Sequence, residues 1–394
     1  MSPGSNTKNN GRSKSVVLGV LLVVVAVVAV VLGRFVLPNT DLRSLNPLAG
    51  FSTTQVSGVV GSEKAGFFRD PDVEKRFRQL GYEVNVTTAG SREIAEQTDL
   101  SQYDFASPSS GPATEKVERQ SSDYTASYPF YSPMGVATFE PIVEILKREG
   151  LVREDNGMQV LDVAGFTELA TSNTRWRDLG SEFPSPRTVQ ISTTDIRTSN
   201  SAAMYLSILY WVFTNENPEL ASNNDELVRQ ITPFFAGQGY TASSSAGPFA
   251  DYLSQGMGAA PMVMVYEAQF LGEQMSPNSR IDDSHVLLYL DPTVQANHGV
   301  VGMNEAGSEV GRLLTEDAEL QELAARHGFR PSNSEIFSEV MSEHGLTPPV
   351  DYVASVDLPS YDQLELLITE VGKAYTTPPR DDPETTTPET TETN

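Results

Sequence analysis

Apolar and polar positions alternate along the chain in a repeated order of short strands and amphipathic helices. In the first part, we expect strands at residues 56–60, 82–88 and 103–106, and helices at residues 70–80 and 92–97. Asp70 and Pro71 are typical of a helix start, and Gly81 of a helix end. This order of elements predicts an α/β fold built on a mostly parallel sheet, with ligands bound beyond the carboxyl ends of the strands.

The same two periodicities continue as far as residue 375. An aromatic-rich run occupies residues 128–139, and we expect strands at residues 188–191, 260–266 and 285–290. Helices are expected at residues 140–149, 166–179, 202–213, 223–235, 248–255, 310–327 and 361–375. The sequence contains no internal repeat.

The stretch at residues 192–205 is dense in hydroxyl and amide side chains, among them Thr198, Ser199, Asn200 and Ser201. It joins an expected strand to an expected helix, so these side chains fall at a helix start. Free backbone N–H groups at a helix start can hold a carboxylate or an oxyanion. Helix capping also uses these residue types, but a cap needs only one of them. The density of polar residues therefore favours a binding site.

The two ends of the chain differ from the middle. Residues 16–37 are almost entirely apolar and long enough for a transmembrane helix, and the basic residues 1–15 precede them. This charge pattern predicts a cytoplasmic N-terminus, a single membrane anchor and an extracellular bulk, with a cleaved signal peptide as the alternative. Residues 38–54 are expected to be a linker. Residues 376–394, rich in Thr, Pro and Glu, are expected to be a disordered acidic tail.

Composition excludes several functions. The 394 residues carry a net charge of −25, which makes nucleic acid an unlikely partner because phosphate binding requires a basic face. There is no cysteine, which rules out disulfides, thiolate metal sites and a cysteine nucleophile. The four histidines are scattered singly, and no phosphate-binding loop or serine-hydrolase elbow is present. We therefore predict no catalytic residues, no metal and no cofactor, and a protein that is not an enzyme.

Four segments together resemble the type II extracellular solute-binding proteins. They are Val-Val-Gly-Ser-Glu-Lys at residues 59–64, Ala-Gly-Ser-Arg-Glu-Ile-Ala at 89–95, Thr-Ser-Asn-Ser at 198–201 and Leu-Leu-Tyr-Leu-Asp-Pro-Thr-Val at 287–294. The chain is most similar to actinobacterial substrate-binding-like domains related to the molybdate and phosphate binders, some of which occur beside von Willebrand A domains. The resemblance covers about residues 55–375.

The resemblance implies a two-lobed periplasmic-binding-protein type II fold with a ligand cleft. Lobe I would comprise residues 55–138 plus 289–375 and lobe II residues 139–288, with crossings near residues 132–139 and 288–293. The implied ligand-binding residues are Ser62, Glu63, Gly90, Ser91, Ser107, Ser109, Ser110, Thr198, Ser199, Asn200, Ser201, Tyr266 and Glu267.

The implied function is capture of a small ligand by hinge closure, for transport or sensing, with a permease or a von Willebrand A domain protein as partner. An envelope protein-interaction module with the same fold is the alternative, and a hydrolase is a third hypothesis without a supporting motif. The acids Glu63, Asp195 and Glu267 would suit a protonated oxyanion, an amine or a metal cation. Lys64 and Arg197 in the same cleft would instead favour an anion.

Overall fold

A computed structural model of the chain describes residues 53–121, 123–238, 242, 244–347 and 354–375. The predicted cytoplasmic tail and membrane anchor, nearly all of the predicted linker and the acidic tail at residues 376–394 lie outside this part. Within it, none of the helices has the length and apolar character needed to cross a bilayer.

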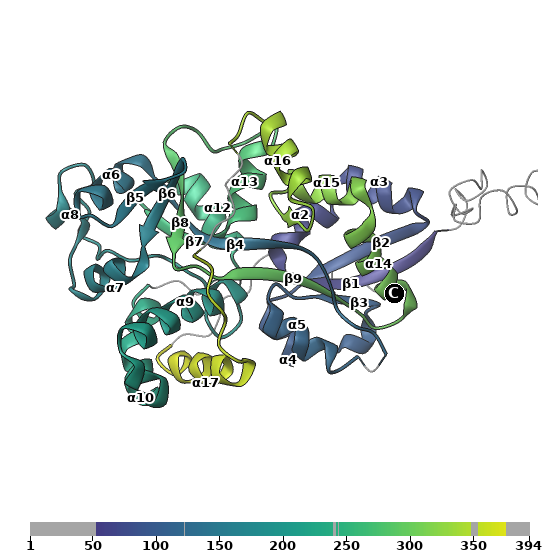
Figure 1. The fold of residues 1–394 in the computed structure, drawn as a ribbon, viewed down its shortest axis with the longest axis horizontal. Coiled ribbons are helices and arrows are strands. Elements are labelled where there is room, and N and C mark those ends of the chain that lie inside the picture. The colour runs from purple at the N-terminus through teal and green to yellow at the C-terminus, as the bar shows by residue number, and fades with distance from the viewer. Residues whose placement is uncertain (1–52, 122, 239–241, 243, 348–353, 376–394) are drawn as a thin grey trace, which may run out of the picture. The chain divides into compact units, whose positions relative to one another are not determined.

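A ten-stranded sheet runs through the described residues (Figure 1). Its strands are β1 (Thr54–Val60), β2 (Tyr82–Thr88), β3 (Phe105–Ser107), β4 (Ser127–Phe139), β5 (Val152–Asp155), β6 (Met158–Asp162), β7 (Met262–Tyr266), β8 (His285–Asp291), β9 (Gln295–Gly302) and β10 (Arg330–Pro331). The order is β2-β1-β3-β9-β4-β8-β6-β5, with β7 and β10 also paired to β4. Three pairings are parallel, β1 with β2, β1 with β3, and β6 with β8. The others are antiparallel, so the prediction of a mostly parallel sheet is wrong.

Two strands, β4 and β9, connect the two ends of this sheet. The first part of β4 pairs with β9 and β10, and residues 134–139 pair with β7 and β8. After β8 the chain passes a cis peptide at Asp291–Pro292 and enters β9, which reaches β3 at its far end. We call β1, β2 and β3 with their helices the first half. The second half is β5 to β8 with the C-terminal part of β4 and their helices.

In the first half, helices cover both faces of the sheet. They are α2 (Ala65–Phe68), α3 (Pro71–Gln79), α4 (Ser91–Glu96), α5 (Gly111–Glu118), α14 (Glu305–Glu316) and α15 (Ala318–Arg326). Successive strand side chains point to opposite faces. Accordingly, Val56 and Val60 of β1 pack among α2, α3, α14 and α15, and Val59 packs with α4 and α5. The predicted start of α3 is confirmed, because the Asp70 side chain accepts the N–H of Asp72.

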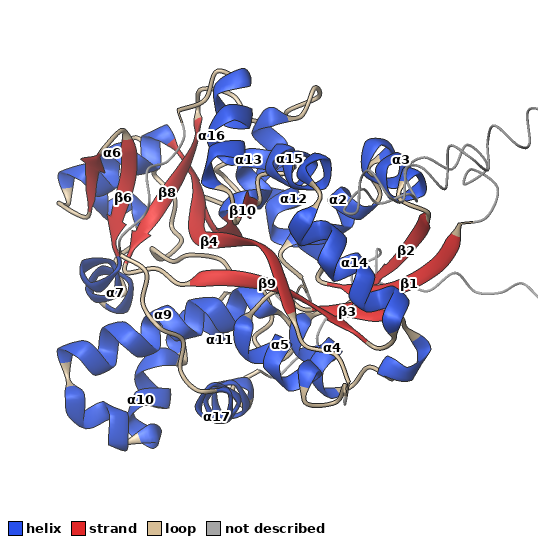
Figure 2. Ribbon diagram, turned by 45° about the vertical axis from the view of Figure 1, so that its right-hand side comes forward, coloured by secondary structure: helices blue, strands red, loops and turns tan. Residues whose placement is uncertain are grey.

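The second half is built around a larger hydrophobic core. Its helices are α6 (Glu140–Arg148), α7 (Val163–Thr171), α8 (Trp176–Leu179), α9 (Asn200–Glu216), α10 (Asn224–Ile231), α11 (Pro233–Ala236), α12 (Ala246–Gln255), α13 (Glu267–Met275), α16 (Ser334–Glu343) and α17 (Tyr361–Gly372). Figure 2 shows α17 close to α9 and α10. The sequence-based prediction assigned residues 289–375 to lobe I, whereas the apolar side chains of α16 and α17 pack in this core.

Four expected elements differ from those observed. The helix expected at residues 223–235 is divided into α10 and α11, and residues 188–191 form a single isolated bridge, at Thr188, rather than a strand. The helix expected at residues 166–179 is divided into α7 and α8, and that expected at 310–327 into α14 and α15. The break between α14 and α15 has a clear cause, because Asp317 caps α15 by accepting the N–H of Leu320 and its carboxylate pairs with Arg76.

Candidate functional site

The strand order creates a place for a ligand at one edge of the first half. β2 and β3 lie on opposite sides of β1, so the chain reverses its direction of winding there. Ligands of open α/β sheets bind at such a switch point, outside the carboxyl ends of the strands. Here β1 is followed by Gly61 and the 3-10 helix η3 (Ser62–Lys64), and β3 by the loop at residues 108–110. The N–H of Gly61 donates to Ser107 O at 3.1 Å, which joins the two strand ends.

Six residues form a buried group at this point, which we call the polar cluster: Glu63, Lys64, Ser109, Asn200, Tyr266 and His298. Its centre is the Lys64 ammonium group, whose side chain is fully buried. Lys64 Nζ lies 2.8 Å from Glu63 Oε1, 3.0 Å from Ser109 Oγ and 3.1 Å from His298 Nδ1. It also donates to the carbonyl oxygen of Pro108 at 3.2 Å. Four acceptors thus surround a cation that is excluded from solvent.

The electrostatic state of the cluster follows from this geometry. Burial opposes ionisation of Glu63, but Lys64 and His298 outweigh it and hold the pKa of Glu63 far below its usual range. Burial, together with the Lys64 ammonium, lowers the pKa of His298 to about 4. His298 is therefore neutral at pH 7, and Lys64 is the cation that faces the Glu63 carboxylate.

The cluster joins the two halves directly. Asn200 begins α9 in the second half, and its Nδ2 donates to Ser109 O in the first half at 3.0 Å. The same nitrogen lies 3.0 Å from the hydroxyl of Tyr266, at the end of β7. Burial, and then the charge of Glu63, raise the pKa of Tyr266 well above its usual value, so its hydroxyl stays protonated. The side-chain amide of Asn200 thus connects Ser109 and Tyr266, which are far apart in sequence.

A second contact between the halves depends on a glycine. Gly90, which precedes α4, lies against the carbonyl group of Thr198 so closely that a Cβ at residue 90 would overlap the carbonyl oxygen. The φ of Gly90 is −64°, a value that any residue adopts. Glycine is therefore required at residue 90 because there is no room for a side chain, and not because of the backbone conformation.

Gly90→Ala is expected to lower the free energy of unfolding by about 1–3 kcal/mol, because the backbone of residue 198 must move away. Chemical denaturation of the full chain measures this. Gly111→Ala is the matched control, since a Cβ at Gly111 meets nothing within 4 Å. Equal stability of the Gly90→Ala variant and the control would contradict the close contact.

The other predicted acids have cations of their own. Glu267 lies at the start of α13, where Arg330 Nε donates to its Oε2 at 2.6 Å and the hydroxyl of Tyr289 to its Oε1 at 2.6 Å. Asp195 accepts from Arg197 Nε at 2.9 Å. Glu63, Asp195 and Glu267 are each buried and each paired with a different cation. Each acid is thus neutralised by a cation of the protein itself. The acids therefore do not favour a cationic ligand, and Lys64 and Arg197 do not favour an anionic one.

The remaining predicted residues lie in the same region with different bonding. Ser91 Oγ accepts the N–H of Ser109 at 2.8 Å, which links α4 to the loop after β3. Ser107 is used structurally, since its hydroxyl donates to Gly299 O of β9. Ser62 lies in η3, and Ser110 and Ser199 precede α5 and α9 without a side-chain capping bond. The hydroxyl of Ser201 lies 2.8 Å from that of Thr194 and 3.2 Å from that of Ser199, and Thr198 Oγ1 is buried without a hydrogen-bond partner.

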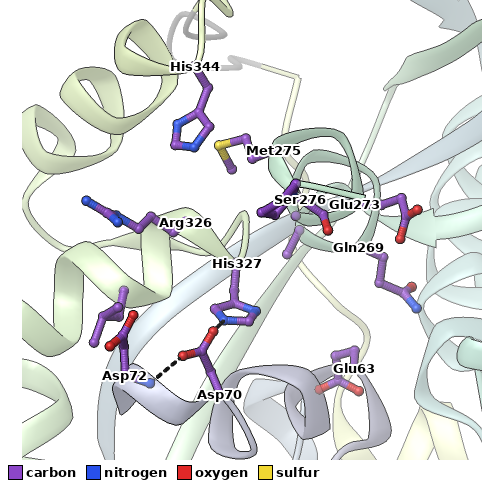
Figure 3. A pocket seen from close by; sticks show the side chains of 14 residues that line it. Glu63, Asp70, Asp72, Gln269, Glu273, Met275, Ser276, Arg326, His327 and His344 are labelled. Atoms are coloured by element: carbon purple, nitrogen blue, oxygen red, sulfur yellow. Dashed lines mark hydrogen bonds and ion pairs between the residues drawn. The ribbon is translucent and has the colours of Figure 1, made fainter. Parts of the chain in front are cut away.

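A pocket of about 440 Å³ opens beside the polar cluster (Figure 3). Glu63 is the cluster residue that lines it. Figure 3 shows Asp70 pointing toward His327, with His327 Nε2 3.0 Å from Asp70 Oδ2. The walls come from α13, the end of α15 and the start of α3. Within the described residues, no three His, Asp or Glu side chains are arranged to hold a metal ion.

Sequence reasoning missed two residues that matter here, His298 and Arg330. The four histidines are scattered singly, so their spacing gives no sign of a role for His298, and β9, which carries it, is not among the expected strands. The Nε2 atom of His298 is buried without a hydrogen-bond partner, and its ring lies among Phe130, Tyr266 and Phe329. Residues 295–302 read Gln-Ala-Asn-His-Gly-Val-Val-Gly and lack a period-2 alternation, so the local sequence carried no clear signal for His298.

Comparison with solved structures identifies the fold. The chain is similar to iron-bound HitA from Pseudomonas aeruginosa, with 9% identity and a TM-score of 0.51, over 81% of this chain and 99% of that one. It is also similar to the apo ferric ion-binding protein A from Pasteurella haemolytica, with 10% identity and a TM-score of 0.50, over 81% and 97%. The sulfate-binding protein SubI from Mycobacterium tuberculosis H37Rv matches with 15% identity and a TM-score of 0.45, over 75% and 93%. No family model matches, and no curated protein matches in sequence.

The described residues therefore have the fold of a type II periplasmic-binding-protein-like domain, and the resemblance inferred from the sequence is confirmed at this level. At sequence identities of 9% and 10%, the similarity to these structures establishes the fold of this chain but not the ligand that it binds.

Proposed function

We propose that this protein captures a small ligand between its two halves by hinge closure and is not an enzyme. The observation that carries the proposal is the polar cluster, in which Glu63, Lys64 and Ser109 of the first half meet Asn200 and Tyr266 of the second. Closure of two domains around a ligand is an established mode of binding, with a few residues of the connecting segments absorbing the motion. Here β4 and β9 are those connections. The pocket beside Glu63 is the proposed route from solvent to the cluster.

A second candidate, a protein-interaction module with the same fold and no transport ligand, is favoured by one observation. The Lys64 ammonium group has four acceptors from the protein itself. The centre of the proposed cleft is thus satisfied without any ligand. A ligand must displace some of these bonds, whereas an interaction module would keep them.

The proposed setting is the outer side of a cell membrane. The apolar residues 16–37 and the basic residues before them support a single anchor with a cytoplasmic N-terminus. In that setting, a permease that receives the ligand, or a von Willebrand A domain protein, is the proposed partner.

A thermal-shift screen of the full chain in mild detergent tests the proposal against oxyanions, amino acids, polyamines, sugars and divalent metals. A ligand at 100 times its dissociation constant is expected to stabilise the folded state by about 2.7 kcal/mol. Asn200→Ala is expected to abolish that shift, because it removes the bond to Ser109 O that joins the halves and the bond that Asn200 makes to the Tyr266 hydroxyl. Asn297→Ala, at an exposed position of β9, is the matched control and keeps the shift.

A ligand shift that survives Asn200→Ala would place the site elsewhere. No shift with any class of compound would favour the interaction module over ligand capture.

A further inference from the structure

The last helix, α17, contacts both halves of the molecule. Figures 1 and 2 both show it between α10 and α4. Its buried side chains join the core of the second half, and they are Leu364, Leu367, Ile368 and Val371. Beyond its end, the ring of Tyr375 lies under the guanidinium group of Arg197, 4.8 Å away, just before α9. This side of α17 is fixed to the second half.

The opposite side of α17 is bonded to α4 of the first half. Arg92 Nε lies 3.0 and 2.8 Å from the two carboxylate oxygens of Glu365. The same guanidinium group donates through Nη1 to Arg197 O at 2.7 Å. The hydroxyl of Tyr361 bonds to the carboxylate of Glu96, one helical turn along α4. Arg92 therefore connects α4, α17 and the segment before α9 at one point.

The chain that leads into α17 is fixed at the crossing between the halves. Thr293, between β8 and β9, donates its N–H to Ala354 O at 3.0 Å and accepts the N–H of Val356 at 2.9 Å. The Thr293 hydroxyl also donates to Met134 O of β4 at 3.0 Å. The C-terminal segment thus begins at the crossing strands and ends against both halves beside the polar cluster.

We propose that α17 is a strap that holds the two halves closed when no ligand is present, and that Arg92 is its clasp. Opening would separate α4 from α9 and from α17, and this requires Arg92 to leave both Glu365 and Arg197 O. The side chains of Arg92 and Glu365 are 24% and 21% exposed, so water screens the pair only partly. The inference rests on the proposed hinge closure, but its test needs no ligand.

The experiment measures the distance between the halves. Arg119→Cys, directly after α5, and Arg229→Cys on α10 introduce two exposed labelling positions into a full chain that has no cysteine of its own. Pulsed EPR of spin labels at these positions then compares the parent with Arg92→Gln and Glu365→Gln. Each variant is expected to raise the open-to-closed ratio about tenfold without added ligand, and the double variant no further.

Glu370→Gln is the matched control on the same helix. Glu370 pairs with Lys373, and their side chains are 41% and 65% exposed. It is expected to leave the distance distribution unchanged. Unaltered distances in both Arg92→Gln and Glu365→Gln, or equal opening in Glu370→Gln, would overturn the strap. If Arg92→Gln does not fold, the distances measured in Glu365→Gln alone test the strap. A ligand screen without a hit would leave the outcome of this distance measurement unchanged.

Discussion

Arg330→Met is expected to lower the free energy of unfolding by about 3–5 kcal/mol, because it leaves a buried carboxylate without its cation. Glu267 is fully buried, and Arg330 is 6% exposed. Two bonds of 2.6 and 2.8 Å join the guanidinium group to this carboxylate. The pair links β10 to the start of α13, so its loss weakens the attachment of α16 as well as the site. Chemical denaturation of the full chain measures the change.

The control for this substitution is Arg153→Met, at another ion pair. Arg153 and Asp291 are joined by 2.6 Å, but their side chains are 50% and 40% exposed. Exposed pairs contribute about 0–1 kcal/mol, so the control is expected to lose no more than that. Similar losses in the two variants would show that burial does not set the importance of the Glu267 pair.

The stability of the protein is expected to fall by about 3 kcal/mol between pH 6.5 and pH 4 through His298 alone. The folded pKa of His298 is about 4, below its ordinary value of 6.5. The unfolded chain therefore binds a proton in this range that the folded chain does not bind, and stability falls as the pH falls. Above about pH 7.5 this residue is neutral in both the folded and the unfolded state, and its contribution no longer varies.

His298→Gln tests this assignment, because glutamine does not titrate and its amide oxygen can still accept from Lys64. The difference in unfolding free energy between parent and variant is expected to change by about 3 kcal/mol from pH 7 to pH 4. Asn297→Ala, at an exposed position of the same strand, exchanges two side chains that do not titrate and is the control. A constant difference between the parent and His298→Gln would show that His298 is not buried in its neutral form.

Together these contacts hold the two halves against each other, and they satisfy the Lys64 ammonium group at the centre of the polar cluster. The Lys64 ammonium group fills the proposed cleft, Asn200 joins its two sides, and α17 lies across both halves. For ligand capture, the free energy of these contacts is what a ligand has to match or exceed. The ligand screen and the spin-label distances therefore test different parts of one equilibrium.

Local sequence predicted much of the first half. The order β1, α3, β2, α4, β3 was expected from periodicity and from the Asp70, Pro71 and Gly81 signals, because these elements depend on neighbours within a few residues. The turns that follow β1 and β3 were also expected near a site, and the structure brings Glu63 and Ser109 together there. Whether these residues bind a ligand stays a prediction.

Long-range pairing is what the sequence left undecided. The mixed sheet arises because β4 pairs with β7, β8, β9 and β10, and no local pattern reveals which strands meet. The same reason hid His298 and Arg330, whose partners Lys64 and Glu267 are 234 and 63 residues away. It also hid the position of α17 on the second half. Sequence by itself determined most of the helices and the strands of the first half, since these depend on periodicity and caps, but it did not reveal β9. Only the tertiary structure decided which charges are paired, since a buried charge needs a partner in space and not in sequence.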